Sequence, residues 1–435
     1  MGYQDILKKK AKDWGYPELM SAARTCSIKK LPFSSPLMNY CTYGGIPRGR
    51  VTEFFGEPGG GKSTSAVDVC INAAKVFTDE YNEKVNDIRE RISSGDKMAE
   101  SELEDLQEVG PKRILYIDLE HGFDPDWANK LGMNACDLLD VMQPPNVVAE
   151  DILQTIEEVI CSGEVGLVVL DSIPSLVTRK ELEKKYGEVT VAALAGLLCV
   201  FMRKVVSLLT RYDCTLININ QIRDNLNNPY DVNTPGGKAP KFYSSLRIRF
   251  RQDKPVDFLG NELPKNTENP AGYIISAAIV KQKTGSNDRK QGTYYLMCQS
   301  GIRPDFDYAL LAVNKYHIIQ KGGAWFTITD PYTKEVLIDE STGKPKPVKV
   351  NGMSKVFDYL NSNPDYYKKL QTYILNDING ISNDVYEEDT EILDYAESET
   401  TEEIISESTD ISTNAVEDAT TETTESVGHN DNDSD

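Results

Sequence analysis

A glycine-rich stretch near the N-terminus has the residue types and spacing of a phosphate-binding loop. In GEPGGGKST, residues 56–64, four residues separate Gly56 from Gly61, and Lys62 and Ser63 follow directly. An apolar strand-like run precedes this stretch and an apolar helix-like run follows it, as a phosphate-binding loop requires. We therefore expect Lys62 to hold the β- and γ-phosphates of ATP and Ser63 to be a Mg²⁺ ligand. The predicted nucleotide contacts are Gly56, Glu57, Pro58, Gly59, Gly60, Gly61, Lys62, Ser63 and Thr64.

Acidic residues end two further strand-like runs. GLVVLD at 166–171 ends in Asp171, and Glu120 comes directly after ILYIDL at 114–119. Open α/β sheets present ligand groups at the carboxyl ends of their strands, so we predict Asp171 as a second residue of the Mg²⁺ site. The run at 114–119 also places Asp118 at a strand end, but Glu120 lies just beyond the strand and is the better candidate of the two for the general base. Acidic residues that merely end strands are the alternative interpretation for both positions.

An amide residue ends another strand-like run, CTLINI at 214–219. Gln221 follows it, and a neutral amide there can hydrogen-bond a γ-phosphate without competing for a proton. The next dozen residues contain few apolar side chains, and a loop of that length in a compact domain is usually functional or disordered. We therefore expect Gln221 to report the state of the nucleotide to this loop.

The strand-like runs predict the sheet that positions these residues. They lie at 51–56, 114–119, 166–171, 214–219, 245–250, 274–280 and 293–298. Helical patterns separate the first four runs, which predicts βαβ units and a largely parallel sheet, with hairpin-like additions at its end. The predicted fold class is α/β, a mostly parallel central sheet flanked by helices.

Residues 77–110 do not fit a simple βαβ unit. Apolar residues recur at helical spacing on both sides of the turn-like SSGD at 93–96. We predict a charged helical hairpin, inserted after the first crossover helix. A spacer or an oligomer contact is a more economical role for it than a part in catalysis.

The charge of the chain is distributed unevenly. The formal net charge is -21, but residues 384–435 contain 19 Asp and Glu and no Lys or Arg. The remaining residues carry 47 basic and 49 acidic groups, so the overall charge does not exclude an anionic partner. Segment 381–435 lacks the apolar surface that would offset its ordering entropy, and we predict that it is disordered.

Other features of the sequence favour a cytosolic protein. No run of 18 apolar residues and no secretory signal is found, and the eight cysteines form no CxxC pair. Three histidines argue against a His-based metal site. Near the N-terminus Leu7, Ala11 and Trp14 share one helical face, which must be buried against something.

Seven blocks of sequence, taken in order, resemble the RecA recombinases of bacteria and phages. They are GGIPRGRVTEFFGEPGGGKST, YIDLEHGFDPDWANKLG, VVLDSIPSLV, MRKV, ININQIR, TPGGKAPKFYSSLRIR and GGAWF. The resemblance covers roughly residues 27–330. The helical hairpin and the length of the acidic tail depart from the usual pattern, which suggests a divergent, virus-encoded member.

The resemblance implies a domain organisation. A RecA-type P-loop ATPase and DNA-binding core would occupy residues 31–304, preceded by a helical protomer-interface segment at 1–30. A small C-terminal α+β domain would follow at 305–380, where AWF and NPDYYKKLQTYIL suggest a packed core. The disordered acidic tail at 381–435 would compete with DNA for a basic channel, or simply act as a solubilising appendage.

The resemblance also implies roles for residues around the nucleotide. Glu120 is similar to the catalytic base of the family, and Gln221 to its γ-phosphate sensor. Asp124 and Trp127 take positions that contact the adenine, although Trp127 could instead be a core aromatic residue. A lysine pair would reach across the subunit interface to the ATP of the neighbour. The implied catalytic residues are Glu120, Lys62, Gln221, Lys281 and Lys283.

Two DNA-binding loops are implied, at 183–191 and 224–235. The implied DNA contacts are Val191, Arg203, Arg223, Leu226, Gly236, Gly237 and Lys238. Val191 and Leu226 would be apolar wedges between base triplets, and the basic residues would contact the strand backbone. An ordinary charged surface is the alternative for the basic residues. Gly196 stands where the family has an arginine that helps to hold DNA.

The function implied is that of an ATP-dependent recombinase with Mg²⁺ as cofactor. It would form helical filaments on single-stranded DNA and exchange strands with homologous double-stranded DNA. Implied partners are both DNA forms, further copies of the chain and accessory loading or single-strand-binding proteins, in the cytoplasm and without a membrane. A ring-forming helicase motor of the same superfamily and a non-catalytic DNA-binding filament protein are the alternatives.

Overall fold

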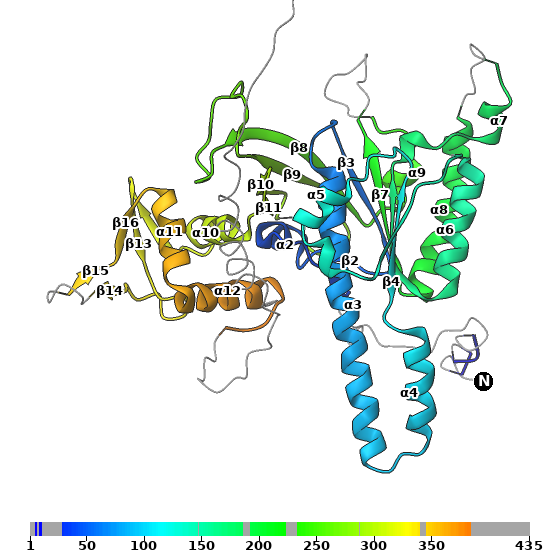
Figure 1. Ribbon diagram of the computed structural model, residues 1–435, viewed down its shortest axis with the longest axis horizontal. Coiled ribbons are helices and arrows are strands. Elements are labelled where there is room, and N and C mark those ends of the chain that lie inside the picture. Colours follow the sequence, from blue (N-terminus) through cyan, green and yellow to red (C-terminus); the bar gives the residue numbers. More distant parts are fainter. Residues whose placement is uncertain are drawn as a thin grey trace, which may run out of the picture. The chain divides into compact units, whose positions relative to one another are not determined.

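The computed structural model describes most of the chain (Figure 1). The described residues are 5–6, 8–10, 28–146, 148–185, 192–222, 233–286, 288–339 and 345–383. Residues 5–6 and 8–10 are helical, in agreement with the predicted N-terminal helix. The predicted apolar face of that helix, Leu7, Ala11 and Trp14, lies outside the described residues, as does the acidic tail from Asp384 onward.

A mixed β-sheet forms the centre of the fold, with strand order β11-β10-β9-β8-β3-β7-β6-β4-β5. Its strands are β3 (Val51–Gly56), β4 (Arg113–Asp118), β5 (Leu139–Met142), β6 (Val165–Asp171), β7 (Thr215–Gln221), β8 (Leu246–Val256), β9 (Gly272–Gln282), β10 (Gln291–Met297) and β11 (Gly301–Ile302). The six strands from β8 to β5 are parallel, and β9, β10 and β11 are added antiparallel. All seven predicted strands are confirmed. The short strand β5, whose ends are only half-buried, was not predicted from its pattern.

Both faces of the sheet are buried, because successive side chains of a strand point to opposite sides. In β6, Leu167 and Val169 join the hydrophobic core that includes helix α3, whereas Val168 and Leu170 join the core that includes α6 and α8. Continuous apolar runs such as GLVVL therefore form central strands. Strands β3, β7, β6 and β4 are parallel neighbours, so their carboxyl ends lie together at the same end of the sheet. The candidate site is found there.

The turn and the second helix of the predicted helical hairpin are confirmed. The prediction that its first helix is separate from the crossover helix is wrong. Helix α3 (Lys62–Ser93) runs without interruption from the phosphate-binding loop into the hairpin, and α4 (Met98–Val109) packs beside it (Figure 1). No glycine or proline occurs within α3, so nothing in its backbone ends the crossover helix before the turn. Buried Val85 and Ile88 of α3 continue the apolar side of the helix into the hairpin.

The remaining helices and short strands of the core surround the sheet. They are β1 (Lys30–Leu31), α2 (Pro36–Thr42), β2 (Ile46–Pro47), α5 (Pro125–Lys130), η2 (Met133–Ala135), α6 (Ala149–Ser162), η3 (Ile173–Ser175), α7 (Arg179–Leu182), α8 (Ala193–Arg211) and α9 (Ala239–Tyr243). By length and composition, α8 is apolar enough to cross a membrane. Its Leu198, Met202, Val205 and Leu209 are fully buried in the core, and core helices of soluble proteins pass the same test.

The C-terminal region has a hydrophobic core of its own. Its elements are α10 (Pro304–Asn314), β12 (Ile319–Gly322), β13 (Trp325–Ile328), β14 (Ile338–Asp339), β15 (Lys346–Pro347), β16 (Lys349–Asn351), α11 (Met353–Ser362) and α12 (Pro364–Ile378). Phe326 of the AWF motif is buried in this core, whereas Trp325 is 51% exposed. Tyr295 and Met297 of β10 belong to the same core, so it is continuous with the edge of the central sheet.

Candidate nucleotide-binding and catalytic site

The loop between β3 and α3 has the backbone geometry of an anion-binding site. Gly59 and Gly61 adopt left-handed backbone angles, with φ of 70° and 86°. A Cβ atom on Gly61 would lie 3.0 Å from the Tyr294 hydroxyl. A larger residue would therefore be strained both by its backbone angle and by this close contact. Gly61 is also the N-cap of α3, and no side chain caps this end of the helix. The first amides of a long helix are therefore left to a ligand, and an anion suits them.

Lys62 lies in this loop with its charge largely removed from water. Its side chain is 8% exposed, and its ammonium donates a hydrogen bond to the Glu57 carbonyl at 2.7 Å. Burial lowers the pKa of Lys62 in spite of nearby carboxylates. In the described part of the chain the ammonium forms no ion pair. A buried cation beside uncapped helix amides fits the terminal phosphates of a nucleotide.

Two aspartates lie side by side at the ends of neighbouring parallel strands. They are Asp118 of β4 and Asp171 of β6. The carboxylate of Asp118 accepts hydrogen bonds from the backbone amides of Glu120 and Phe123 at 3.1 and 2.8 Å. The Gln143 side chain donates a third at 2.8 Å. Although burial opposes it, these donors hold the pKa of Asp118 below its usual value. Asp118 therefore fixes the turn after β4 and has little capacity left for a metal.

Asp171 is held by a tyrosine hydroxyl instead. It is 7% exposed, and the Tyr116 hydroxyl donates a hydrogen bond to its Oδ2 at 2.6 Å. Burial raises the pKa of Asp171, and hydrogen bonds from Tyr116 and Ser63 partly offset that rise. Ser63 and Asp171 thus lie together, as the sequence predicted for a Mg²⁺ site. Within the described residues no three His, Cys, Asp or Glu side chains form a group that could hold a metal ion.

Glu120 lies just beyond β4 and is joined to residues of two other strand ends. Its Oε1 accepts a hydrogen bond from Gln221 Nε2 at 3.0 Å and a short one from the Ser172 hydroxyl. The Ser175 hydroxyl lies 3.5 Å from the same oxygen. The structure therefore brings together the predicted base and the predicted sensor. Ser172 and Ser175 were not predicted, although their places directly after the strand that ends in Asp171 could have indicated them.

Asp124 and Trp127 begin helix α5 next to the start of α3. The Asp124 carboxylate caps α5, accepting hydrogen bonds from the amides of Asp126 and Trp127 at 2.9 and 3.2 Å. The indole N–H of Trp127 lies 3.4 Å from the Thr64 hydroxyl. The aromatic ring is therefore close to the phosphate-binding loop. A contact of either residue with adenine stays a prediction.

A buried polar network that the sequence did not predict surrounds Asn220, the residue before Gln221. The Asn220 side chain donates to Glu53 Oε1 and to the Pro235 carbonyl, both at 3.0 Å, and accepts from the backbone N–H of Gln221 at 3.0 Å. Glu53 is fully buried and pairs with Arg247 at 2.5 Å. Asn220 thus ties Gln221 to the residues that follow segment 223–232. The period-two pattern of the strand gave no sign of this, because polar residues on a buried face are the exception.

The lysine pair Lys281 and Lys283 lies at the end of β9 and contacts helix α9. Lys281 donates to the carbonyls of Lys241 and Phe242 at 2.7 and 2.8 Å, and Lys283 to that of Phe242 at 3.3 Å. Positive charges at the carboxyl end of a helix are favourable. Burial, together with the positive charges of Lys283 and Arg247, lowers the pKa of Lys281 to about 8. Their predicted reach to a neighbouring subunit is not tested by a single chain.

Of the predicted DNA contacts, Val191, Arg223 and Leu226 lie outside the described residues. Arg203 on α8 and Lys238 before α9 are exposed, and the Arg203 guanidinium donates to the Cys199 carbonyl at 3.4 Å.

The two glycines have a structural explanation. Both have left-handed backbone angles, and Cβ atoms on Gly236 and Gly237 would lie 2.7 Å from Leu198 and 2.9 Å from Ala195. They allow this segment to pack closely against α8.

Comparison with known proteins gives a consistent result. Residues 84–303 match the RecA N-terminal domain family, a range that begins within α3, after the phosphate-binding loop. "Protein RecA" of Thermus aquaticus is 29% identical over 334 residues, 76% of this chain and 80% of that protein. "Protein RecA" of Clostridium perfringens is 32% identical over 291 residues, 66% of this chain and 69% of that protein. "Protein RecA" of Thermotoga maritima is 27% identical over 350 residues, 80% of this chain and 82% of that protein.

Proposed function

Since the chain belongs to the RecA family, we propose that it is an ATP-dependent recombinase that forms helical filaments on single-stranded DNA. It pairs this strand with homologous double-stranded DNA and exchanges strands, in recombination and repair in the cytoplasm of a bacterium. The observation that carries the proposal is the hydrogen bond between Gln221 and Glu120 at 3.0 Å, which joins the predicted phosphate sensor to the predicted base.

The residues around the loop have distinct roles in ATP hydrolysis. Lys62 and the first amides of α3 bind the phosphates, and Ser63 and Asp171 hold Mg²⁺. When bound, Mg²⁺ neutralises charge that develops on the transferred phosphoryl group. Glu120 accepts a proton from the attacking water as general base, a role that typically contributes about 10²–10⁴-fold in rate.

Gln221 connects this chemistry to DNA binding. Its amide now donates to Glu120, and a γ-phosphate oxygen within reach would compete for the same N–H group. Because the Asn220 side chain binds both the Gln221 backbone N–H and the Pro235 carbonyl, a movement of the Gln221 backbone would also act on the far end of the second DNA-binding segment. ATP binding and DNA binding then favour each other equally, as linkage requires.

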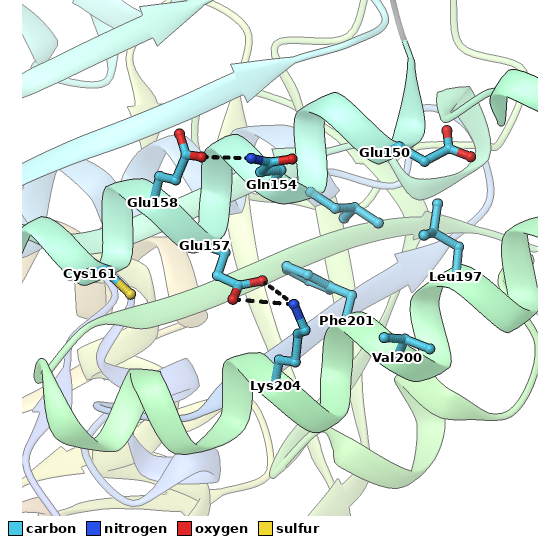
Figure 2. A pocket seen from close by; sticks show the side chains of 10 residues that line it. Glu150, Gln154, Glu157, Glu158, Cys161, Leu197, Val200, Phe201 and Lys204 are labelled. Atoms are coloured by element: carbon cyan, nitrogen blue, oxygen red, sulfur yellow. Dashed lines mark hydrogen bonds and ion pairs between the residues drawn. The ribbon is translucent and has the colours of Figure 1, made fainter.

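Self-assembly is supported by a groove of about 490 Å³ between α6 and α8 (Figure 2). Leu197, Val200 and Phe201 of α8 provide apolar side chains, and Val200 is 44% exposed. Glu150, Glu157 and Glu158 of α6 provide carboxylates on the other side. Among the side chains that line this groove, Lys204 is the one cation, and it pairs with Glu157 at 3.3 Å.

The N-terminal segment of a second copy has the complementary character. The sequence pattern predicts one helical face with Leu7, Ala11 and Trp14, and places Lys8, Lys9, Lys10 and Lys12 mostly elsewhere. We expect this segment to dock in the groove between α6 and α8 of the neighbouring protomer. Repeated head-to-tail, a contact of this kind gives an open helical filament when its rotation does not close.

Strand exchange between a circular single strand and a homologous duplex tests the proposed function. The wild type should exchange strands with ATP, and Glu120→Gln should bind ATP and DNA while its hydrolysis falls at least about 100-fold. Binding of single-stranded DNA is measured in parallel with ATP, with ADP and without nucleotide. Equal affinity in all three conditions, or ATP-driven unwinding without exchange, would contradict the proposal. Absence of DNA-stimulated hydrolysis in the wild type would favour a non-catalytic filament protein.

A further inference from the structure

We infer that Tyr116 is a positioning residue that orients Asp171 for Mg²⁺, an inference that rests on the proposed nucleotide site. Tyr116 lies near the middle of β4 and is 2% exposed. Its hydroxyl donates to Asp171 Oδ2 at 2.6 Å. Nothing in the phosphate-loop pattern or in the acidic ends of the strands points to this tyrosine.

The strand register explains how the contact forms. Asp118 and Asp171 are register partners, and Tyr116 precedes Asp118 by two positions, so Tyr116 and Asp171 lie diagonally on one face of the sheet. A diagonal pair is within reach of a long aromatic side chain. The α3 side of the sheet buries this face, which also brings Ser63 to the same carboxylate.

Packing fixes the Tyr116 ring independently of its hydrogen bond. Tyr116 belongs to the hydrophobic core on the α3 side, and its ring lies 5.3 Å from that of Phe123, at 60°. The hydroxyl group is therefore held in place by groups that do not take part in catalysis. With Oδ2 engaged by a fixed donor, the Asp171 carboxylate cannot rotate freely, and its orientation toward Ser63 is set before Mg²⁺ arrives.

The two aspartates at the carboxyl ends of β4 and β6 therefore have different roles. Asp118 accepts three N–H donors and fixes the turn that carries Glu120. Asp171 is held by the Tyr116 hydroxyl, and the Ser63 side chain lies close to the same carboxylate. Residues that orient a metal-binding side chain typically contribute about 10–100-fold to metal affinity. Tyr116 should contribute at the lower end of this range, because phosphate and water would supply other ligands.

The test measures nucleotide binding rather than hydrolysis. Binding of a fluorescent ATP analogue to the full-length protein is titrated with Mg²⁺ for the wild type and for Tyr116→Phe. We expect the Mg²⁺ concentration for half-maximal binding to rise about 10-fold in Tyr116→Phe. Binding without Mg²⁺ should stay as in the wild type. Tyr366→Phe is the matched control, because it removes another hydroxyl hydrogen bond, to the Thr329 carbonyl at 3.0 Å, far along the chain in the C-terminal region.

A double-mutant cycle with Asp171→Asn separates orientation from general loss of packing. If Tyr116 acts through Asp171, adding Tyr116→Phe to Asp171→Asn should change the Mg²⁺ requirement little further. An unchanged Mg²⁺ requirement in Tyr116→Phe, an equal rise in Tyr366→Phe or a full additional effect in the double variant would overturn the inference. A wild type that binds no nucleotide would instead refute the proposed function, so the two failures are distinguishable.

Discussion

Gln221 Nε2 donates a hydrogen bond to Glu120 Oε1 at 3.0 Å, although the strands that carry them, β7 and β4, are not neighbours. Strand β6 lies between them and ends in Asp171, so the contact passes over the predicted Mg²⁺ site. A direct hydrogen bond between the predicted sensor and the predicted base would couple phosphate binding to the position of the base. If Gln221 turned to a γ-phosphate, this hydrogen bond to Glu120 would be lost.

Replacing Gln221 with Ala should uncouple DNA binding from the nucleotide. The variant keeps Lys62 and Ser63, so we expect ATP to bind with near wild-type affinity, while single-stranded DNA binds equally well with ATP and ADP. Fluorescence anisotropy of a labelled oligonucleotide measures both affinities. Ser175→Ala removes the 3.5 Å contact with Glu120 and a 3.4 Å contact with the Ser172 hydroxyl but leaves Gln221 in place, so it serves as control and should keep the nucleotide dependence. A preference for ATP retained in Gln221→Ala would show that the signal takes another route.

Activity that depends on Lys281 should fall as the pH rises through about 8, the value to which burial lowers its pKa. Its ordinary pKa is 10.5, so the folded protein releases this proton earlier than the unfolded chain does. The charged lysine therefore disfavours the fold below about pH 8, and this penalty disappears as the pH approaches 10.5.

The corresponding measurement is DNA-stimulated ATP hydrolysis from neutral to alkaline pH. An uncharged Lys281 cannot act on a neighbour's phosphates, so the wild type should lose activity above about pH 8. Lys281→Arg stays charged and should move the alkaline limb to higher pH. The same alkaline limb in Lys281→Arg would assign it to another group.

Gly236→Ala should destabilise the protein by about 1–3 kcal/mol, because alanine is strained in a left-handed conformation. The φ angle of Gly236 is 87°, and its Cβ would lie 2.7 Å from Leu198 Cδ1. Gly196→Ala on α8 is the matched control, since a Cβ there meets nothing within 4 Å. Alanine in a helix should stabilise it by about 0.5–1 kcal/mol relative to glycine. Denaturant unfolding of both variants measures the change in the free energy of unfolding, which should fall in Gly236→Ala and rise in Gly196→Ala. A change in the same direction in both variants would contradict this explanation.

Gly196→Arg should strengthen the binding of single-stranded DNA. The position is exposed and open, and the resemblance to the family places an arginine there. One added phosphate contact should steepen the dependence of log affinity on log salt concentration by about 1. Gly196→Ala measures the effect of the helix alone. An unchanged salt dependence in Gly196→Arg would remove α8 from the DNA-binding surface.

Removal of residues 384–435 should strengthen DNA binding and lower its Mg²⁺ requirement, because this segment carries 19 acidic residues and no basic ones. A tail of equal length with Asn and Gln in place of Asp and Glu separates charge from length and should behave like the truncated protein. Unchanged DNA binding in both variants would leave the tail as a solubilising appendage.

Much of the site could be predicted because its signals are local in sequence. The phosphate-binding loop needs particular residues at fixed spacing. Asp171 and Gln221 end apolar strands that alternate between two buried faces, and Glu120 follows such a strand. The prediction for 77–110 was wrong about its first helix, because periodicity continues through α3 and nothing local marks where a crossover helix should end.

The order of the strands in the sheet could not be predicted from local sequence. Which strand ends become neighbours depends on hydrophobic burial of the whole sheet, a non-local effect with no signature in any single run. Tertiary structure alone decided that Gln221 meets Glu120, that Tyr116 reaches Asp171 diagonally and that Asn220 joins Gln221 to Pro235. The sequence determined which chemistry is present, through residue types and spacing. Folding determined which of these groups touch, because hydrogen bonds between strand ends require a register that only the packed sheet defines.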